Sequence, residues 1–504
     1  MITLAVALLL STFPQDSLHL RVLATHDFHG ALLARPYEWS AGRPIGGAAA
    51  LGAYIARRRE ECECVSLYLD GGDQMQGTLE SNLDYGASTV RMFNRLGLDA
   101  AAIGNHELDW GPDTLRARLR EAAYPWLAAN VYDSVTARRP EWARASALLQ
   151  RRGMRIGVVG YVTSSTKRIV MPRHVAGLVF RPGYEAIADA ITDIERAQPD
   201  FLVLVAHAAA DCDSAGCTGE IAELVRTAPP GTFDLIVSGH AHSSGSGVVE
   251  GIPILRASSS ARALAVADLF KGGDGGIRFS LAVDTVYADV VEPAPAIALA
   301  VDSIRRRTDA IASRVVGELR TGLSRVDPWL GNMVTDALRH AVRADVALTN
   351  AGGLRRDFGP GPVTYGELYE LYPFGNQISV LQVTGAELRK VAAYAARGGS
   401  FHVSGIRVHY DVERQIVTAL TLADGPAVRD GDTYSLAVPD FLAEGAAGFP
   451  FAGRAATTDR SVLDAIVGWI DRSAGPVDAP TDRRIVTTSS GGSSGRSERA
   501  ITNP

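Results

Sequence analysis

Strand-like and helix-like runs alternate along the first half of this chain, from Leu18 to about Val286. Alternation of this kind packs helices against the faces of a sheet, so it predicts a layered α/β domain. The predicted strands are residues 18–24, 65–69, 100–103, 156–162, 201–206 and 235–238. The predicted helices are residues 46–60, 88–96, 112–122, 184–196 and 219–227.

Five short polar segments follow these predicted strands, and each carries side chains that bind metal ions. The segments are Asp27-Phe28-His29, Asp70-Gly71-Gly72-Asp73, residues 104–109, His207 and Gly239-His240-Ala241-His242. The carboxyl ends of strands in an α/β sheet form one ligand-binding edge, so we expect these side chains to gather there. Carboxylate, amide and imidazole ligands without thiolate favour Zn, Mn, Fe or Co over Ca. The pattern predicts a centre that activates water to attack a phosphate ester.

The spacing within the segments indicates which side chains can reach the same metal ion. Asp27 and His29 are two residues apart, so in an extended segment both side chains point to the same side. Asp73 follows two glycines, which let the backbone turn sharply, and its two oxygens can bridge two cations. His240 and His242 repeat the two-residue spacing after another strand. A solvated or acidic turn would explain any one of these segments alone, but not all of them together.

The segment around residue 106 is the most specific of the five. Asn105 supplies a neutral carbonyl ligand, and the adjacent His106 can stay off the metal and face a substrate. Asp109, three residues on, can hold that imidazole as a cation. The alternative reading is a capped helix N-terminus. His207 ends an apolar run. A lone histidine there is more often a buried, hydrogen-bonded core residue, so its assignment as a metal ligand depends on the other segments.

Composition limits the remaining possibilities. The chain has 504 residues, of which 46% are hydrophobic, and this length suggests two or three domains with ample core. Its formal net charge of -6 disfavours a nucleic-acid polymer as partner. We predict a catalytic domain over residues 18–290, a linker helix over 291–314, a C-terminal domain over 315–486 and a disordered tail over 487–504.

Residues 1–17 resemble a secretory signal segment. Their apolar run is too short to span a bilayer, and no later run approaches the required length, so we expect no transmembrane helix. This favours export to a periplasmic or extracellular location. Two local cysteine pairs in an exported protein suggest disulfides or idle thiols, and Cys212 and Cys217, which close a short loop, are a plausible disulfide. Cys62 and Cys64 are too tightly spaced for an easy bridge if they lie on a strand, and a zinc site built from all four cysteines is a less favoured alternative.

The second half carries its own candidate site. Asn350-Ala351-Gly352-Gly353-Leu354-Arg355 follows a predicted strand at residues 345–349, after a predicted helix at residues 329–342. The glycines, Gly353 among them, permit close approach of the backbone to a ligand. Arg355 offers a planar fork for an anionic or polar group. Alone this is a weak signal, because glycine-rich turns are common.

Together these motifs resemble the calcineurin-like metallophosphoesterase superfamily, and with the second half they resemble the 5'-nucleotidase family. That family includes periplasmic UDP-sugar hydrolases and 2',3'-cyclic-nucleotide phosphodiesterases. The resemblance covers about residues 20 to 480. It implies an N-terminal four-layer α/β/β/α sandwich, a linker helix and a smaller C-terminal α/β substrate-binding domain.

The resemblance also implies roles for individual residues. One divalent ion would be held by Asp27, His29, Asp73 and His242, and a second by Asp73, Asn105, His207 and His240. His106 and Asp109 would form a catalytic dyad. The substrate nucleotide would contact Asn350, Gly353 and Arg355, with its base between Phe374, in Tyr372-Pro373-Phe374-Gly375-Asn376, and Phe449.

Two positions depart from the family pattern. The family usually has glycine two residues after the third-motif histidine, whereas this chain has Ala209 there, which puts the loop beside His207 in doubt. The family commonly has an acidic residue where this chain has Ala447, before the predicted second ring. The preference for base or ribose is therefore expected to differ from that of a standard 5'-nucleotidase.

The implied activity is that of an exported phosphohydrolase with two metal ions. It would release phosphate from nucleoside 5'-monophosphates by attack of a metal-bridging hydroxide. Hydrolysis of 2',3'-cyclic nucleotides, UDP-sugars or thiosulfate esters on the same scaffold is the nearest alternative. A non-catalytic nucleotide-binding protein is a different class, and the complete set of proposed ligands with His106 and Asp109 argues against it.

Overall fold

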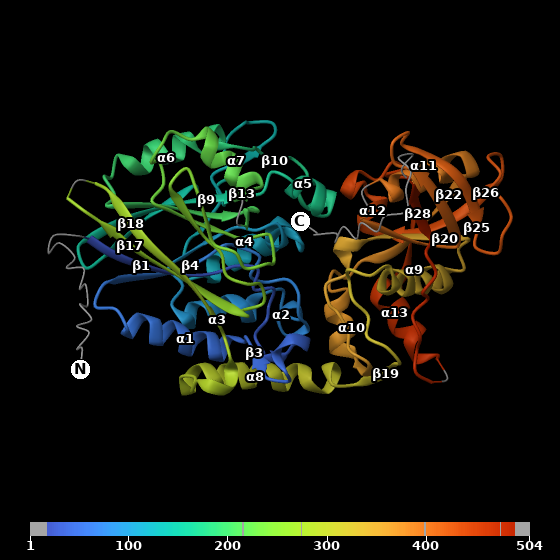
Figure 1. Cartoon of the computed structure of the whole chain (residues 1–504), viewed down its shortest axis with the longest axis horizontal. Helices are drawn as coiled ribbons and strands as arrows, with labels where there is room; N and C mark the ends of the chain where they lie inside the picture. The colour runs from blue at the N-terminus through green and yellow to red at the C-terminus, as the bar shows by residue number, and fades with distance from the viewer. Residues whose placement is uncertain (1–17, 214–215, 274, 398–399, 474, 489–504) are drawn as a thin grey trace, which may run out of the picture.

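The computed structural model describes residues 18–213, 216–273, 275–397, 400–473 and 475–488. The chain forms two α/β domains that lie side by side (Figure 1). The signal-like segment, residues 1–17, lies outside the described residues. Within the described part of the chain, every helix is too short or too polar to cross a membrane.

Two six-stranded sheets form the centre of the N-terminal domain. The first has the order β18-β17-β1-β4-β5-β6 and the second the order β15-β16-β14-β11-β9-β8. Strands β1, β4, β5 and β6 run parallel, as do β9, β11, β14 and β16. The first sheet comprises β1 (Leu18–Thr25), β4 (Val65–Asp70), β5 (Ala100–Ala102), β6 (Trp126–Leu127), β17 (Ala263–Lys271) and β18 (Ile277–Thr285). The second comprises β8 (Ser146–Arg151), β9 (Met154–Val162), β11 (Phe201–His207), β14 (Leu235–Ser238), β15 (Gly247–Val249) and β16 (Ile252–Leu255).

Helices cover the outer face of each sheet (Figure 1). On β1, Val22 packs between the two sheets, whereas its neighbour Leu23 packs under the helices of the first sheet. Because both faces are covered, the strands read as continuous apolar runs. The four-layer α/β/β/α fold class is therefore confirmed. The covering helices are α1 (Ala48–Glu60) and α3 (Ala87–Leu96) on the first sheet, and α6 (Ala188–Glu195) and α7 (Glu220–Thr227) on the second.

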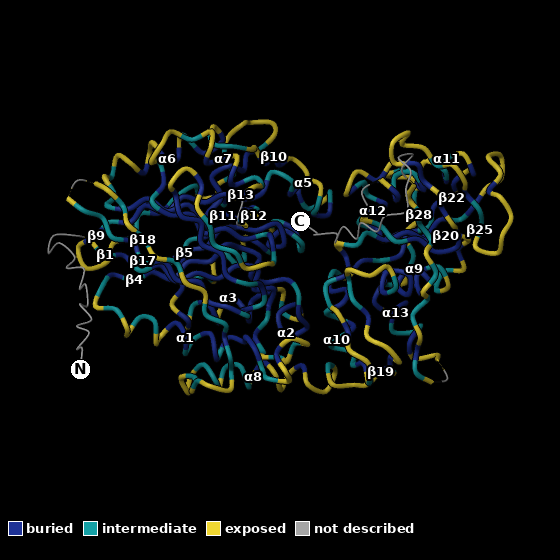
Figure 2. Tube along the Cα trace, viewed as in Figure 1, coloured by how far each residue is buried: buried dark blue, intermediate teal, exposed yellow. Residues whose placement is uncertain are grey.

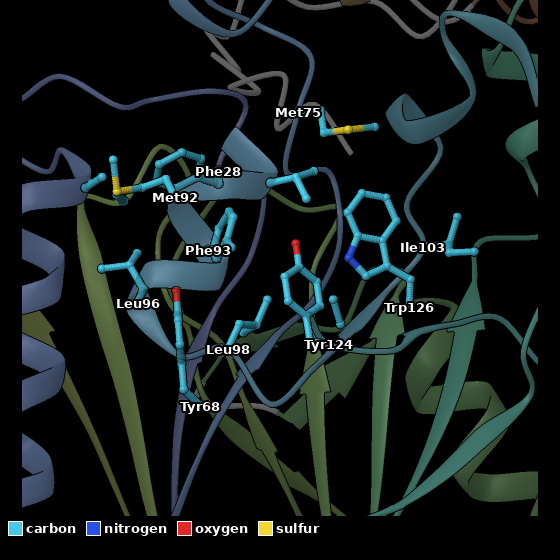
Figure 3. Close-up of a cluster of buried hydrophobic side chains, with 14 of the residues drawn as sticks. Phe28, Tyr68, Met75, Met92, Phe93, Leu96, Leu98, Ile103, Tyr124 and Trp126 are labelled. Carbon is cyan, nitrogen blue, oxygen red and sulfur yellow. The ribbon is translucent and has the colours of Figure 1, made fainter. Parts of the chain in front are cut away.

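Buried side chains in and beside the polar segments anchor those segments to the core beneath the helices of the first sheet (Figure 3). Phe28, Met75 and Ile103 are each at most 1% exposed, and each lies one or two residues from a predicted metal ligand. The Phe28 ring packs edge-on against Phe93 of α3, with 5.0 Å between centroids. Burying a side chain of this size contributes about 1.5–3 kcal/mol, so core packing holds the polar loops in place.

The smaller C-terminal domain is built on a five-stranded sheet of order β23-β20-β26-β22-β27. Buried residues fill the centre of both domains (Figure 2). The sheet strands are β20 (Val346–Asn350), β22 (Gln377–Thr384), β23 (Phe401–Ser404), β26 (Thr433–Pro439) and β27 (Ala456–Ser461). Helices α9 (Pro328–Val342) and α13 (Val462–Asp471) pack on one face, and α11 (Gly385–Ala396) packs on the other. A three-stranded sheet pairs β24 (Ile406–Asp411) with β25 (Ile416–Leu422) and β28 (Ile485–Thr488).

Helix α8 (Pro295–Ala312) connects the two domains and lies along the lower edge of the view in Figure 1. Ile304 and Thr308 on this helix are buried, and Ile304 belongs to the core of the N-terminal domain. The helix is thus packed on that domain rather than free between the two. The remaining helices and strands are β2 (Arg35–Pro36), β3 (Pro44–Ile45), α2 (Leu79–Asn82), α4 (Gly111–Glu121), β7 (Val131–Asp133), α5 (Thr166–Ile169), β10 (Leu178–Phe180), β12 (Asp211–Asp213), β13 (Gly216–Thr218), β19 (Val315–Leu319), β21 (Gly361–Thr364), α10 (Tyr365–Leu371) and α12 (Asp440–Ala443).

The cysteine pairs correct one expectation and confirm another. Cys62 and Cys64 form a disulfide, although their spacing argued against an easy bridge. The pair lies in the turn before β4, so its Cα atoms are 5.1 Å apart. Alternate Cα atoms in an extended strand lie about 6.6 Å apart, and the turn shortens this to a favourable disulfide distance. Cys212 and Cys217 are joined as predicted, so a site built from all four cysteines does not form.

The predicted disordered tail begins too early. Thr487 and Thr488 belong to β28 and pair with Tyr410 and Asp411 of β24. Backbone hydrogen bonds between the strands order these polar residues, although their side chains add little to the hydrophobic core. The remainder of that tail, from residue 489, lies outside the described residues.

His402 on β23 gives the C-terminal domain a predicted sensitivity to acid. A Cβ added at Gly331 of α9 would lie 2.0 Å from the His402 ring, so the ring is packed directly on this helix. Burial, with a smaller effect of the Arg484 charge, lowers the pKa of His402 to about 4. Because the unfolded chain then binds the proton more tightly, stability is expected to fall by roughly 2–3 kcal/mol as the pH drops from about 6.5 to 4.

Denaturant unfolding of the wild type and of His402→Leu across this pH range tests that prediction. The variant is expected to lose the roughly 2–3 kcal/mol that His402 contributes to the pH dependence of the unfolding free energy. His409→Leu is the matched control, because His409 is exposed on β24 and its replacement should leave the dependence unchanged. An equal pH dependence in the wild type and His402→Leu would contradict the prediction.

Candidate metal centre

The structure brings all seven side chains predicted to bind metal into one cluster. They come from the loops that follow β1, β4, β5 and β14 and from the last residue of β11, where the carboxyl ends of the parallel strands meet. Five of the seven are buried, and the two histidines after β14 are half-buried. The seven are Asp27, His29, Asp73, Asn105, His207, His240 and His242.

Four of these residues surround a first position. The Nε2 atoms of His29 and His242 are 3.1 Å apart. Asp27 Oδ1 lies 3.3 Å from His242 Nε2 and 3.7 Å from His29 Nε2. Asp73 Oδ2 completes the group at 4.0 Å from His29 Nε2. This is the set predicted to hold the first ion.

The second predicted set surrounds a neighbouring position. His207 Nε2 lies 3.0 Å from Asp73 Oδ2 and 3.1 Å from Asn105 Oδ1. His240 Nδ1 lies 3.3 Å from His207 Nε2. The same oxygen, Asp73 Oδ2, therefore borders both positions, as a carboxylate shared between two ions would.

The donor atoms fit divalent transition-metal ions. Metal–ligand bonds of about 2.0–2.2 Å imply separations of roughly 3–3.6 Å between neighbouring ligand atoms, and most of the distances above lie close to that range. Asp27 Oδ1 is buried and has no hydrogen-bond donor among the described residues. A buried carboxylate oxygen without a donor carries a large desolvation cost, which a cation beside it removes.

The backbone at this cluster is held in an uncommon conformation. Asp27, His29, Asp73 and His240 all have positive φ, between 49° and 73°. Each such residue costs on the order of 1–3 kcal/mol and persists where the surroundings impose it, typically at functional sites. Four of the seven predicted ligands share this feature, which supports a built site rather than a set of solvated turns.

Glu107 organises the loops beneath the cluster, and its importance was not predicted beyond its place in the motif. Its buried carboxylate accepts hydrogen bonds from the backbone N–H groups of Asp73, Gln74 and Gly104. Burial and repulsion by Asp73 raise the pKa of Glu107 to about 7. A Cβ at Gly104 would lie 2.2 Å from Asp73 Oδ1, so glycine is required for this close approach.

Two further supporting residues were missed by sequence reasoning. His26 Nδ1 contacts Asp27 Oδ2 at 2.5 Å and so fixes the carboxylate; its place next to Asp27 was the only local signal. Arg256 is 1% exposed and donates to the carbonyl oxygens of Ala210 and Ser243. It ties the loop after His207 to the loop that carries His240 and His242.

The contacts of Arg256 help to fix the loop at residues 208–210, in which Ala209 replaces the family's glycine. Ala208 and Ala210 are fully buried in the core of the second sheet. His207 Nδ1 contacts the carbonyl oxygen of Gly71 at 2.8 Å, which directs Nε2 toward the cluster. The alanines therefore leave His207 in the predicted position.

The electrostatics of the cluster favour bound cations. Burial alone would raise the pKa of Asp27 and of Asp73, but neighbouring histidines lower both, His242 for Asp27 and His207 for Asp73. Burial likewise lowers the pKa of His242 to about 3. Burial would also lower the pKa of His207, but the charge of Asp73 outweighs it and raises that pKa to about 10. At neutral pH the carboxylates are therefore charged, as metal ligands must be, and an ion bound by His207 would have to displace its proton.

His106 faces the same cluster without belonging to either set. Its Nδ1 contacts Asp109 Oδ2 at 2.6 Å, and its Nε2 lies 3.9 Å from Asp73 Oδ2. Burial would lower the pKa of His106, but the charges of Asp109 and Asp73 outweigh it and raise the pKa. The imidazolium is thus stabilised at the edge of the ligand cluster.

The C-terminal domain reaches directly into this centre. Arg355 Nη2 lies 3.3 Å from His242 Nε2 and 3.4 Å from His29 Nε2. The Phe374 ring stacks on His106 with 5.7 Å between centroids. Gln76 and Asn82 of the N-terminal domain donate to the carbonyl oxygen of Pro373, at 3.0 Å each, and fix the Phe374 loop.

The other predicted substrate contacts from this domain lie near Arg355 along the chain. Asn350 ends β20, and its Oδ1 is buried without a hydrogen-bond partner among the described residues. A Cβ on Gly353 would lie 2.9 Å from the Tyr372 ring, so this glycine is needed for packing. Asn350 thus has an unused polar atom, whereas Gly353 has an evident structural role.

The structure does not place Phe449 as an accessible ring. Phe449 is 4% exposed in the C-terminal core, where it contacts Tyr394 and Phe451. Phe441 on α12 is half-buried instead. Asn376, two residues after Phe374, donates to Asp440 at 2.7 Å, and Asp440 also accepts from the Phe441 backbone N–H. These bonds link the Phe374 loop to the start of α12, which carries Phe441.

Comparison with known proteins agrees with this geometry. Residues 20–244 match the calcineurin-like phosphoesterase family, and residues 304–454 match the 5'-nucleotidase C-terminal domain. The chain is 27% identical to Endonuclease YhcR of Bacillus subtilis, over 94% of this chain but only 41% of that protein. It is 26% identical to the 5'-nucleotidase of Vibrio cholerae, with 86% of each chain covered.

A solved structure supports the fold of both domains together. The crystal structure of a 5'-nucleotidase precursor from Thermus thermophilus matches with a TM-score of 0.82 at 24% identity, covering 93% of this chain and 99% of that one. The two family matches lie in the order expected for a catalytic domain followed by a C-terminal domain. The chain therefore belongs to the 5'-nucleotidase family with an N-terminal calcineurin-like phosphoesterase domain, and it is a metal-dependent phosphoester hydrolase.

Proposed function

We propose that this chain releases phosphate from nucleoside 5'-monophosphates at a centre of two divalent ions, held by the two ligand sets that share Asp73. The observation that carries this proposal is the meeting of the two domains at the ligand cluster. Arg355 and Phe374 of the C-terminal domain lie within contact distance of His242 and His106. A substrate with its phosphate at the cluster would therefore meet a guanidinium group and an aromatic ring.

The protein's own groups suit each stage of the hydrolysis. When bound, divalent ions make water nucleophilic near neutral pH and polarise phosphoryl oxygens. His106, held by Asp109, donates a hydrogen bond to the phosphoryl or leaving oxygen and stabilises the charge that develops there. Arg355 offsets phosphate charge from the side of the C-terminal domain. The nucleoside then extends toward Phe374.

The base is expected to stack between Phe374 and Phe441 rather than Phe449. Stacking on an aromatic ring contributes about 1–3 kcal/mol, so Phe441→Ala should raise KM for AMP by roughly 5- to 150-fold with little change in kcat. KM for p-nitrophenyl phosphate, which has no base, should stay within about twofold. Steady-state phosphate release measures both.

Phe449→Ala is the matched comparison. Because Phe449 is buried, its truncation should lower the unfolding free energy of the C-terminal domain by about 3–5 kcal/mol. If Phe449→Ala raised KM for AMP at unchanged stability while Phe441→Ala had no effect, Phe449 would be the stacking ring.

The ester class is tested with a panel of substrates. Phosphate release is measured from AMP, UMP, bis-p-nitrophenyl phosphate and UDP-glucose, with Mn²⁺ or Zn²⁺ added and with EDTA. We expect metal-dependent turnover of AMP. Ala447 is exposed with a φ of 54°, where the family commonly has an acidic residue, so the ribose or base is held differently here. Turnover of the diester or UDP-glucose alone would reassign the substrate to one of those classes.

Export of the protein is part of this proposal. Both cysteine pairs are joined as disulfides, a state typical of oxidising compartments outside the cytoplasm. External AMP does not cross membranes, so intact cells that express the chain should hydrolyse it as fast as lysed cells. Activity that appears only after lysis would contradict export.

A further inference from the structure

A second group of metal-binding side chains lies in the N-terminal domain, at the opposite end of β1 from the phosphoesterase centre. His19 is near the start of β1, Asp268 is on the neighbouring strand β17, and Cys62 and Cys64 are in the turn between α1 and β4. All four residues are half-buried, and one donor atom from each lies within 4.8 Å of those from the other three. The phosphoesterase reaction uses none of them.

Hydrogen bonding prepares the imidazole of this group to bind a metal. His19 Nε2 lies 2.9 Å from Asp268 Oδ1. A carboxylate only accepts hydrogen bonds, so Nε2 carries a proton, and a neutral imidazole in this orientation presents its lone pair at Nδ1. Nδ1 faces Cys62 Sγ at 4.0 Å. A carboxylate that orients a histidine in this way is a recurrent feature of metal sites.

The same hydrogen bond is held in place by its surroundings. Arg21 donates to both oxygens of Asp268, at 2.8 and 2.9 Å. The His19 ring also stacks on Phe270, with 4.2 Å between centroids. The imidazole is therefore pre-oriented toward the two cysteines.

We propose that reduced Cys62 and Cys64, together with His19 Nδ1, form a second metal site that is lost when the two thiols are oxidised. Two thiolates and one imidazole favour a soft ion such as Zn²⁺, and the partial exposure of the site leaves the fourth position to water. In the oxidised protein the two sulfur atoms are bonded to each other. A disulfide sulfur is no longer a thiolate ligand.

The switch between the two states is a thiol–disulfide exchange. A small-molecule disulfide accepts two electrons from the Cys62 and Cys64 thiolates. The Cys62–Cys64 bond forms, the external S–S bond breaks into two thiolates, and the metal ion is released. This inference is independent of phosphoester hydrolysis, because the donor set of the phosphoesterase centre contains no sulfur.

Cobalt binding to the full-length chain tests the proposal. The protein is reduced with a phosphine, desalted without oxygen and titrated with Co²⁺, and the thiolate-to-cobalt absorption in the near ultraviolet is recorded. We expect this band to appear in the reduced protein and to be absent from the oxidised protein, while the phosphoesterase centre takes up further Co²⁺ without a thiolate band. His19→Gln should weaken Co²⁺ binding by at least about tenfold.

Paired cysteine variants locate the site. Cys62→Ser/Cys64→Ser should lack the band, whereas Cys212→Ser/Cys217→Ser should keep it, and circular dichroism checks that both variants fold. AMP hydrolysis is not the readout, so failure of this proposal and failure of the nucleotidase proposal are distinguishable. Absence of the band from the reduced wild type, or its persistence in the folded Cys62→Ser/Cys64→Ser variant, would overturn the proposal.

Discussion

Replacing Asp73 by Asn is expected to lower kcat for phosphate release by about 10³-fold or more, with reduced metal content. Asp73 Oδ2 lies 3.0 Å from His207 Nε2 and 4.0 Å from His29 Nε2, so one oxygen borders both ligand sets. Asparagine keeps the size of the side chain but removes the charge that attracts both ions. Loss of metal-ion stabilisation costs several kcal/mol in the transition state, and each 1.36 kcal/mol is about tenfold in rate.

Asp70→Asn is the matched control for this substitution. Asp70 is equally buried, but it contacts Thr25, Gly72 and Gln74 rather than the ligand atoms. Burial raises the pKa of Asp70 to about 6, so a neutral amide is a mild replacement. Activity of Asp70→Asn should stay within about tenfold of the wild type. Elemental analysis with steady-state kinetics measures both variants, and full activity and metal content in Asp73→Asn would contradict the ligand assignment.

His106→Gln is expected to lower kcat by about 10²–10⁴-fold while leaving the metal content unchanged. His106 Nε2 faces the cluster, but its Nδ1 is engaged by Asp109, so the ring is placed for substrate rather than for an ion. The charges of Asp109 and Asp73 raise the pKa of His106 and so favour the proton that we propose stabilises the leaving oxygen. Glutamine can fill the space without carrying that charge.

Asp109→Asn separates the positioning role from the catalytic one. Because Asp109 acts through His106, its replacement should cost only about 10- to 100-fold. The double variant His106→Gln/Asp109→Asn should be no slower than His106→Gln, since the two residues act as a unit. Loss of bound metal in His106→Gln would instead make His106 a ligand, and unchanged kcat would remove it from the reaction.

The strands and the gathering of the proposed metal ligands at one edge were predictable because both leave local patterns. Strand β11 is covered on both faces, so it reads as the continuous apolar run at residues 201–206. His207 ends that strand, and His240 and His242 closely follow β14, where parallel strands present their ligands. The two-residue spacing of Asp27 and His29 likewise predicted that their side chains point to the same side. Periodicity and position were sufficient for these features.

Other features depend on packing between distant segments and leave no such pattern. Phe441 and Phe449 flank one stretch of small residues, and only the three-dimensional turn there decides which ring is buried. Arg256 is a charged residue after a strand, and its burial follows from carbonyl oxygens contributed by other loops. The contact of Arg355 with His242 crosses two domains. The Cys62–Cys64 disulfide depends on where β4 begins, a boundary that spacing alone does not define.

Titration of the metal-free protein with divalent ions tests the two-ion centre most directly. The chain is stripped with EDTA, dialysed and supplied with increasing Mn²⁺ or Zn²⁺, and phosphate release from AMP is measured at each step. Two ligand sets that share Asp73 predict no activity before addition, and full activity only when two ions are bound per chain. Activity that survives EDTA, or that is complete with one ion per chain, would contradict the account.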